Sequence, residues 1–576
     1  MVKIRKVEIR NFRSVRSLDW CPVEGINCLV GPGDSGKSTI LDALDLCLGA
    51  RRNLAVADTD FFGLDVTQDI GIALTLGALP DALKNIDAYG EYLRGFDAAT
   101  DSVEDEPRKG LETVLTLKLT VKADLEPIWT LYSDRTVMLE TPRGLAWKDR
   151  MALAPARLGN HPNSNLSWTR GSVLNRLSDE RADVGPELVS AAREARAGFG
   201  VKAALKLAAT LKTVTDTAKS LGVPVGASAT ALLDAHSVSF GDGAISLHSE
   251  SGIPLRNLGT GSSRLLIAGL HRAAAEAASI VLVDEIEYGL EPHRLARLLG
   301  SLGAKEKAPP LQVFMTTHSP VVLRELSGPQ LFVVRDTDGT HRVLQVGSEN
   351  DVQSTIRCFP EAFLARTVIV CEGASEVGLV RGLDEFWTAL GHASLQASGV
   401  SYVDTGGGEA DRCFYRAAAF QKLGYRVAVL QDNDKTPTPA VVAEFKAAGG
   451  YLVVWRNGRA LEDELFLSVP KVAVTALIKR AIELTEDSLI DQHIKTTSLG
   501  KSSLKNVLLD GKDAGFSVAV RELLGKSARI RKAGWFKSIT KMEGVALDIL
   551  GPNLDATEAE FSDVVRNLFA WARTHA

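Results

Sequence analysis

The chain has 576 residues, of which 45% are hydrophobic and 24% charged, and its net charge is −5. One hydrophobic core rarely serves a chain of this length, so we expect roughly two to four domains. The slight negative charge argues against a general binder of polyanions but permits local basic patches.

Targeting signals and disulfides are not expected. Met1–Lys6 alternates charged and apolar side chains, as a strand does and a signal peptide does not. No apolar run has the length of a membrane span. Six scattered cysteines without a CxxC pair are typical of a reduced protein. The sequence therefore predicts a cytoplasmic protein without a membrane anchor.

The first nucleotide motif lies between a predicted strand and a predicted helix. Residues 2–9 alternate as a strand, and the apolar stretch Ile26–Val30 leads into the GxxxxGK[ST] motif at 31–39. The glycines let backbone N–H groups surround a phosphate at the start of a helix. Lys37 is expected to pair with the β- and γ-phosphates of ATP, and Ser38 to ligate Mg²⁺. The predicted contacts are Gly31, Gly33, Asp34, Ser35, Gly36, Lys37, Ser38 and Thr39.

Two later predicted strands end on residues that are typical of ATPase active sites. The buried stretch Ser279–Val283 runs into Asp284 and Glu285, as in a Walker B motif. Asp284 is expected to hold the Mg²⁺ shell, and Glu285 to orient or deprotonate the attacking water. The strand Val313–Thr317 ends on His318, which we interpret as a γ-phosphate sensor, although a lone histidine can also be structural.

A run of small residues opens a helical pattern before Walker B. Asn257–Arg264 contains Gly261 and Ser262, predicted here to form a signature loop that binds nucleotide; a plain helix cap is the alternative. Upstream, 69–76 and 114–121 have the alternation of strands. The Ala/Leu/Arg-rich stretch at about 165–235 lacks sustained heptads, so we expect a compact helical insert that joins subunits.

Four acids follow two apolar strands in the second half of the chain. Glu372 ends the strand 367–371 and Glu376 lies one helical turn later, while Asp432 and Asp434 follow the strand 427–430. Helical patterns between these strands predict a parallel sheet, whose functional groups gather at the carboxyl ends of strands. Acids that converge there would repel one another without divalent metal, so a site for Mg²⁺, Mn²⁺ or Ca²⁺ is expected. Solvated loop carboxylates or helix caps are the alternative.

The order of these motifs resembles a known family. The ATPase motifs are similar to an ABC-type head of the branch that manages DNA ends. In such heads the signature loop completes the site of the opposite subunit, which implies a homodimer or a higher homo-oligomer. The strand-end Glu-Gly and Asp-x-Asp resemble a Toprim domain. A head followed by such a domain resembles the overcoming-lysogenization-defect (OLD) family of ATP-linked nucleases, to which the Gabija-type antiphage nucleases belong.

The resemblance gives further residues a role. Gly406–Gly408 is similar to the family's glycine turn, Glu462 to a metal ligand and Lys537 to a lysine that reaches the scissile phosphate. A basic cluster interleaved with Trp535 and Phe536 suits a contact with the DNA backbone, although a solvated helix face has the same composition. Its members are Lys526, Arg529, Arg531, Lys532, Lys537 and Lys541.

The expected fold is α/β. An ABC-type ATPase head over 1–365, with the helical dimerisation insert at about 165–235, precedes a Toprim nuclease domain over 366–576 that ends in a helical, basic segment. The expected function is an ATP-binding and ATP-hydrolysing endonuclease that cuts double-stranded DNA by a two-metal mechanism, in antiphage defence and with a possible helicase-like partner. The catalytic residues would be Glu372, Glu376, Asp432, Asp434, Lys537 and Glu285. The alternative is a RecF/SMC-like repair ATPase with a non-cleaving Toprim half; a primase or topoisomerase fits less well.

Overall fold

The computed structural model of the chain describes residues 2–51, 54–137, 143–158, 247–274, 279–513, 515–530 and 533–574, with short stretches between 173 and 228. Most of the insert predicted at 165–235 lies outside the described residues; α6 (Ala208–Ser220) is a described part of it. The chain divides into two compact units. The first comprises Met1–Arg13, Cys21–Asn27 and Ile40–Met315, and the second Ser14–Trp20, Cys28–Thr39 and Thr316–Ala576.

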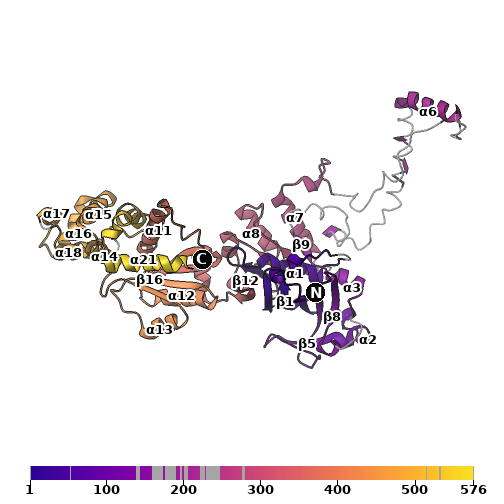
Figure 1. The fold of residues 1–576 in the computed structure, drawn as a ribbon, viewed down its shortest axis with the longest axis horizontal. Helices are drawn as coiled ribbons and strands as arrows, with labels where there is room; N and C mark the ends of the chain where they lie inside the picture. Colours follow the sequence, from indigo (N-terminus) through magenta and orange to yellow (C-terminus); the bar gives the residue numbers. More distant parts are fainter. Residues whose placement is uncertain are drawn as a thin grey trace. The chain divides into compact units, whose positions relative to one another are not determined.

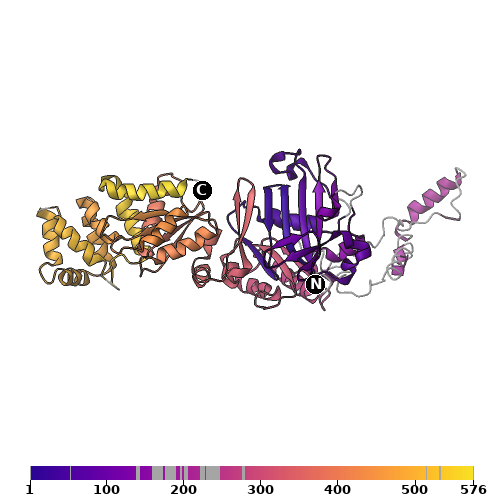
Figure 2. The ribbon, with the colours of Figure 1, turned by 90° about the horizontal axis from the view of Figure 1, so that it is seen from below.

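The first unit contains long antiparallel strands, which Figure 2 shows side by side in indigo and purple. β1 (Lys3–Phe12) pairs with β4 (Ile70–Gly77), and β4 pairs with β7 (Glu112–Val121). The other edge of β7 pairs with β5 (Leu93–Asp97) and β8 (Pro127–Tyr132), and β6 (Ser102–Glu104) extends β5. The two strands expected at 69–76 and 114–121 are therefore present as neighbours.

Three parallel strands in the same unit carry Walker B. The order is β9 (Ala156–Leu158), β10 (Ile280–Val283) and β11 (Gln312–Thr316). Every residue of β10 and β11 is buried, as expected for parallel strands covered on both faces. The side-chain amide of Gln312 accepts from the Ile4 N–H at 2.7 Å and donates to the Ile4 carbonyl at 3.0 Å. These two bonds join β11, the neighbour of the Walker B strand β10, to β1.

In the second unit, four strands frame the first nucleotide motif. Their order is β2 (Val15–Trp20), β13 (Thr340–Gln345), β12 (Leu331–Thr337) and β3 (Ile26–Val30). β12 and β13 form an antiparallel hairpin whose tip, Asp338 and Gly339, has positive φ at both residues, as a two-residue turn of this kind needs. The remaining pairs are parallel, and β3 leads through the glycine-rich loop into α1 (Lys37–Leu48).

A separate four-stranded parallel sheet carries the Toprim acids. Its order is β15 (Val400–Asp404), β14 (Thr367–Cys371), β16 (Arg426–Gln431) and β17 (Tyr451–Val454). The connecting helices are α11 (Ala374–Ala389), α12 (Arg412–Lys422) and α13 (Pro439–Ala447). Figure 1 shows α12 and α13 on one side of this sheet and α11 with α21 (Ala559–Arg573) on the other. The sequence prediction of a parallel sheet is correct.

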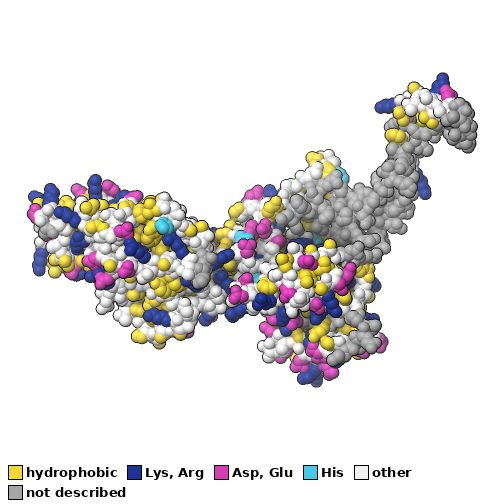
Figure 3. Space-filling model, viewed as in Figure 1, with side chains coloured by type: hydrophobic (Ala, Val, Ile, Leu, Met, Phe, Trp, Pro, Cys, Tyr) yellow, Lys and Arg dark blue, Asp and Glu magenta, His cyan; other side chains and the backbone are white. Residues whose placement is uncertain are grey.

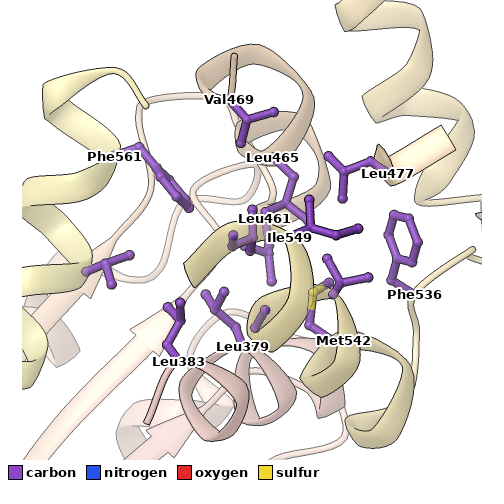
Figure 4. Close-up of a cluster of buried hydrophobic side chains, with 14 of the residues drawn as sticks. Leu379, Leu383, Leu461, Leu465, Val469, Leu477, Phe536, Met542, Ile549 and Phe561 are labelled. Carbon is purple, nitrogen blue, oxygen red and sulfur yellow. The ribbon is translucent and has the colours of Figure 1, made fainter. Parts of the chain in front are cut away.

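Helices after β17 form the rest of the second unit's core. They are α14 (Leu461–Ser468), α15 (Lys471–Leu484), α16 (Asp487–Thr497), α17 (Leu504–Asp513), α18 (Val518–Ala528) and α19 (Ile539–Val545). Figure 4 shows Leu379 of α11, Leu461 of α14 and Met542 of α19 in one apolar cluster. A Cβ on Gly378 would meet the Ile539 carbonyl at 2.5 Å, so only glycine lets α11 and α19 approach this closely.

No described helix combines the length and the apolar composition that a membrane span requires.

Candidate active sites

The glycine-rich loop of the second unit has the backbone that phosphate binding needs. Gly31 and Gly36 have φ of 141° and 81°, and a Cβ on Gly36 would lie 2.5 Å from the His341 ring. The Lys37 side chain is buried, and its ammonium donates to the carbonyls of Gly31 at 3.2 Å and Pro32 at 2.7 Å. The lysine therefore lies against the loop that would surround a phosphate, and the residues fit a nucleotide.

In the first unit, the Walker B acids directly follow β10. Asp284 is half-buried and Glu285 is exposed, and Glu285 has a φ of 46°, which a side-chain-bearing residue rarely adopts. Such local strain often occurs at functional positions. His318, in the second unit, is exposed two residues after the end of β11, as expected for a side chain at a strand tip.

The predicted signature loop begins α7 (Thr260–Ala273). Gly261 is buried, and a Cβ there would lie 2.7 Å from the Gly289 carbonyl oxygen. The Ser262 hydroxyl accepts from Arg294 at 3.1 Å. The loop is thus packed directly against the segment that follows Walker B.

The Toprim acids gather at the carboxyl ends of β14 and β16. Glu372 Oε2 accepts from the Asp432 N–H at 3.0 Å, and Asp432 Oδ1 accepts from the Leu461 N–H at 2.9 Å. These two bonds bring the strand ends and the start of α14 together, and Glu462 is the next residue along that helix. Glu376, in the first turn of α11, is buried, and its Oε2 accepts from the Gly373 N–H at 2.9 Å.

Burial raises the pKa of all four of these carboxyls, and repulsion within the group adds to it for Glu376 and Asp432. For Glu376 and Asp432 the pKa lies well above the ordinary value; burial is the main cause, and the Glu462 carboxylate adds to it in both. Burial also raises the pKa of Glu372 and Glu462. The carboxyls are therefore close enough to influence one another, as the sequence predicts for Glu372, Glu376 and Asp432.

The donor chemistry of this group fits a hard divalent cation. Glu462 Oε1 is buried and has no hydrogen-bond partner in the part of the chain that the structure describes. An all-carboxylate set of ligands suits Mg²⁺, Mn²⁺ or Ca²⁺, and a cation would relieve the repulsion that raises the pKa values. Among the described residues, no three His, Cys, Asp or Glu side chains already surround one point that could hold an ion. Instead, a backbone N–H donates a hydrogen bond to each of the carboxylates of Glu372, Glu376 and Asp432.

Cationic side chains border the acids. The charge of Lys537 lowers the pKa of Glu462, opposing the effect of burial, and its ammonium donates to the Arg529 carbonyl at 3.4 Å. Arg529 forms ion pairs with Asp434 at 2.9 Å and with Asp463 at 3.4 Å. Asp434 therefore faces Arg529.

Lys435 is a cation at this site that the sequence reasoning missed. Its ammonium lies 4.0 Å from Glu372 Oε1 and donates to the Gly408 carbonyl at 2.9 Å. Its place directly after the Asp432–Asp434 motif is the signal that could have identified it. The predicted glycine turn, Gly406–Gly408, has positive φ at all three residues and lies beside it.

The prediction that Trp535 and Phe536 belong to a DNA-binding surface is wrong. Trp535 and Phe536 are fully buried, and the Trp535 indole N–H donates to His493 Nδ1 at 3.1 Å. These rings anchor the segment that carries Lys537 and offer no surface to DNA. Arg531 and Lys532 lie outside the described residues. In the view of Figure 3, Lys and Arg side chains are scattered among acidic ones over the helical C-terminal segment.

His493→Gln is expected to make the protein's melting temperature less sensitive to acid. Burial lowers the pKa of His493 below its ordinary 6.5, so the unfolded state binds the proton more readily. Its contribution to stability is present above pH 6.5 and is lost as the pH falls through the folded-state pKa. Melting curves of both proteins between about pH 7.5 and 5.5 test this; equal slopes would contradict it.

Family models match both parts of the chain. One described as "AAA domain, putative AbiEii toxin, Type IV TA system" matches residues 26–324, more than half of the chain. The chain belongs to this AAA domain family. A second model, "Overcoming lysogenization defect protein-like, TOPRIM domain", matches residues 363–434, which include Glu372, Asp432 and Asp434. The predicted fold class, an ABC-type ATPase head followed by a Toprim domain and C-terminal helices, is confirmed, as is the resemblance to OLD-type proteins.

Two individual relatives are similar to parts of the chain. The OLD nuclease of Thermus scotoductus is 24% identical over 359 residues, which cover 55% of this chain and 59% of that protein. The DNA replication and repair protein RecF of Chlorobium limicola is 39% identical over 59 residues, 10% of this chain and 16% of RecF. The chain thus spans less than two thirds of either relative.

Solved structures of Smc heads are also similar to the chain. The Smc head bound to the C-winged helix domain of ScpA has 16% identity and a TM-score of 0.34, over 61% of this chain and 99% of that one. The Pyrococcus furiosus Smc head with an extended coiled coil has 14% identity and the same TM-score, over 60% of this chain and 96% of that one. These scores are low, so the fold assignment rests on the strand pairings and the family models.

Proposed function

We propose that the chain is an ATP-hydrolysing, metal-dependent DNA endonuclease. Residues 1–365 would form the ATPase that controls cutting, and residues 366–576 the nuclease. The observation that supports this best is the group of carboxyls at the ends of β14 and β16 and the starts of α11 and α14. Their pKa values are raised, Glu376 and Glu462 are buried, and Glu462 Oε1 has no hydrogen-bond partner among the described residues. A domain that only bound DNA would gain nothing from this costly burial of acids, which disfavours a non-cleaving repair ATPase.

The chain's own residues would divide the work of cutting a phosphodiester. Glu372, Asp432 and Glu462 would hold divalent metal, with Glu376 and Asp434 as further ligands. Bound metal would supply activated water and charge stabilisation at the leaving oxygen. Lys537 lies beside these acids and would neutralise charge that develops on the scissile phosphate. In the ATPase, Lys37 and Ser38 would hold ATP and its Mg²⁺, Asp284 the Mg²⁺ shell, Glu285 the attacking water and His318 the γ-phosphate.

The assembly and biological role are also part of the proposal. Gly261 and Ser262 would complete the nucleotide site of a second copy, and the insert at 165–235 would join the two copies in a homodimer. The substrate would be double-stranded DNA, and the setting antiphage defence, both by similarity to the OLD family.

Divalent metal is expected to stabilise the wild-type protein and not the Glu372→Ala/Asp432→Ala double variant. Ligand that binds only the folded state raises stability by RT ln(1 + [L]/Kd), about 2.7 kcal/mol at a hundredfold excess over Kd. Melting curves of the metal-stripped proteins with and without Mn²⁺ measure this directly, without relying on catalysis. Equal shifts in the melting temperature of both proteins would show that the metal does not bind at Glu372 and Asp432.

Cutting is expected to depend on the nucleotide state. Plasmid and linear duplex DNA would be incubated with wild type in Mg²⁺ or Mn²⁺, with and without ATP, beside Lys37→Ala. The rate in wild type should change on adding ATP, whereas the rate in Lys37→Ala should not. If ATP alters neither or both equally, the ATPase does not control the nuclease.

A further inference from the structure

Arg264, in the first turns of α7, is completely buried with its charge. Its guanidinium reaches the loop after Walker B, where Nη1 donates to the carbonyls of Glu285 at 3.2 Å and Tyr288 at 2.7 Å. Nη2 lies 3.4 Å from the Asp284 carbonyl, at the long end of hydrogen bonding. One side chain thus contacts three backbone carbonyls of this loop, those of Asp284, Glu285 and Tyr288.

Burying this cation is costly, so its position calls for an explanation. Burial lowers the pKa of the Arg264 guanidinium, and the carboxylates of Glu287, Glu285 and Asp284 oppose that effect. Among the described residues its hydrogen-bond acceptors are backbone carbonyls, and its Nε has no partner there. A core that needed only stability would be served better by an apolar side chain of similar volume.

The loop that Arg264 holds is strained and tightly packed. Glu285 has a φ of 46°, a conformation that persists only when the surroundings impose it. On the same side of α7, Gly261 approaches the Gly289 carbonyl so closely that a Cβ would lie 2.7 Å from it. Arg264 is therefore well placed to impose the conformation of the backbone from Asp284 to Tyr288.

We propose that Arg264 is a positioning residue for ATP hydrolysis, which fixes the backbone of Asp284 and Glu285 so that the Glu285 carboxylate faces the attacking water. The inference rests on the proposed function, in which Glu285 performs that task. It also couples the signature helix to Walker B, because the side chain that holds the loop belongs to α7. A lysine has a single ammonium and cannot reproduce the planar fork that spans these carbonyls.

The test compares the kinetics of ATP hydrolysis in wild type, Arg264→Lys and Arg264→Gln. A misplaced catalytic group can cost about a hundredfold in rate, so kcat should fall by roughly tenfold to a hundredfold in both variants. KM and the affinity for a fluorescent ATP analogue should stay within about threefold, because the phosphate-binding loop is untouched. Rates are expressed per mole of folded protein, taken from melting curves, so that a loss of stability does not count as a loss of rate.

Arg272→Lys is the matched control. Arg272 lies on the same helix and also donates to a backbone carbonyl, that of Ser301 at the end of α8 (Pro292–Ser301), and it pairs with Glu306; neither partner belongs to the loop from Asp284 to Tyr288. Its kcat should remain that of wild type. Wild-type kcat per folded protein in Arg264→Lys and Arg264→Gln would overturn the inference, as would an equal fall in the Arg272 variant. If the wild-type protein hydrolyses no ATP, the proposed ATPase function is wrong, and that result is distinct from a wild-type kcat in the Arg264 variants.

Discussion

Asp432→Asn is expected to nick plasmid DNA about 10²–10³-fold more slowly than wild type, the loss typical of removing one charge-stabilising group. Asparagine keeps the oxygen that accepts from the Leu461 N–H, so the join between β16 and α14 should survive. The change removes a charge from the group formed with Glu372 and Glu462, and with it the affinity for a divalent cation. Rates of conversion of supercoiled to nicked plasmid at saturating Mn²⁺ measure the effect.

Glu409→Gln provides the control for this loss. Glu409 is an exposed acid that directly follows the glycine turn, and within the described part of the chain no hydrogen bond joins its side chain to Glu372, Glu376, Asp432 or Glu462. Its variant should nick DNA as wild type does. Wild-type activity in Asp432→Asn, or an equal loss in Glu409→Gln, would remove Asp432 from the chemistry.

Lys37→Ala is expected to weaken ATP binding by about 10–100-fold, since a hydrogen bond to a charged group contributes about 1.5–3 kcal/mol. The ammonium already lies against the loop carbonyls of Gly31 and Pro32. Its loss therefore removes the cation from the place where the phosphates would bind. Titration with a fluorescent ATP analogue measures the affinity, and unchanged binding would contradict the assignment of the loop.

Glu285→Gln separates binding from hydrolysis in the same assay. The variant should retain ATP with wild-type affinity and hydrolyse it slowly, because only the group that orients the water has changed. Loss of binding in this variant would show that Glu285 has a different role.

Local patterns predicted much of the fold and the acids of the site. The glycine-rich loop needs only nine neighbouring residues, 31–39, and the alternation in 69–76 and 114–121 marks its own strands. Glu372 and Asp432 were found because parallel strands present their carboxyl ends at one edge of a sheet. In each case the residues that give the signal lie within the element they specify or directly after it.

Contacts between distant segments could not be predicted in this way. Arg529 reaches Asp434 across 95 residues, so its partner is not visible in its own neighbourhood. Trp535 and Phe536 stand among basic residues, and nothing local indicates that Phe466 and His493 enclose the indole ring of Trp535. Likewise, the hydrogen bond from Arg264 to the Glu285 carbonyl depends on the packing of α7 against the loop that follows β10.

The most direct test of the central claim is a time course of plasmid nicking by the wild-type protein in Mn²⁺ and in EDTA. The acids gathered at the ends of β14 and β16 predict nicks that accumulate with Mn²⁺ and cease in EDTA. Intact plasmid throughout, or the same rate of nicking in EDTA, would contradict a metal-dependent nuclease at this site.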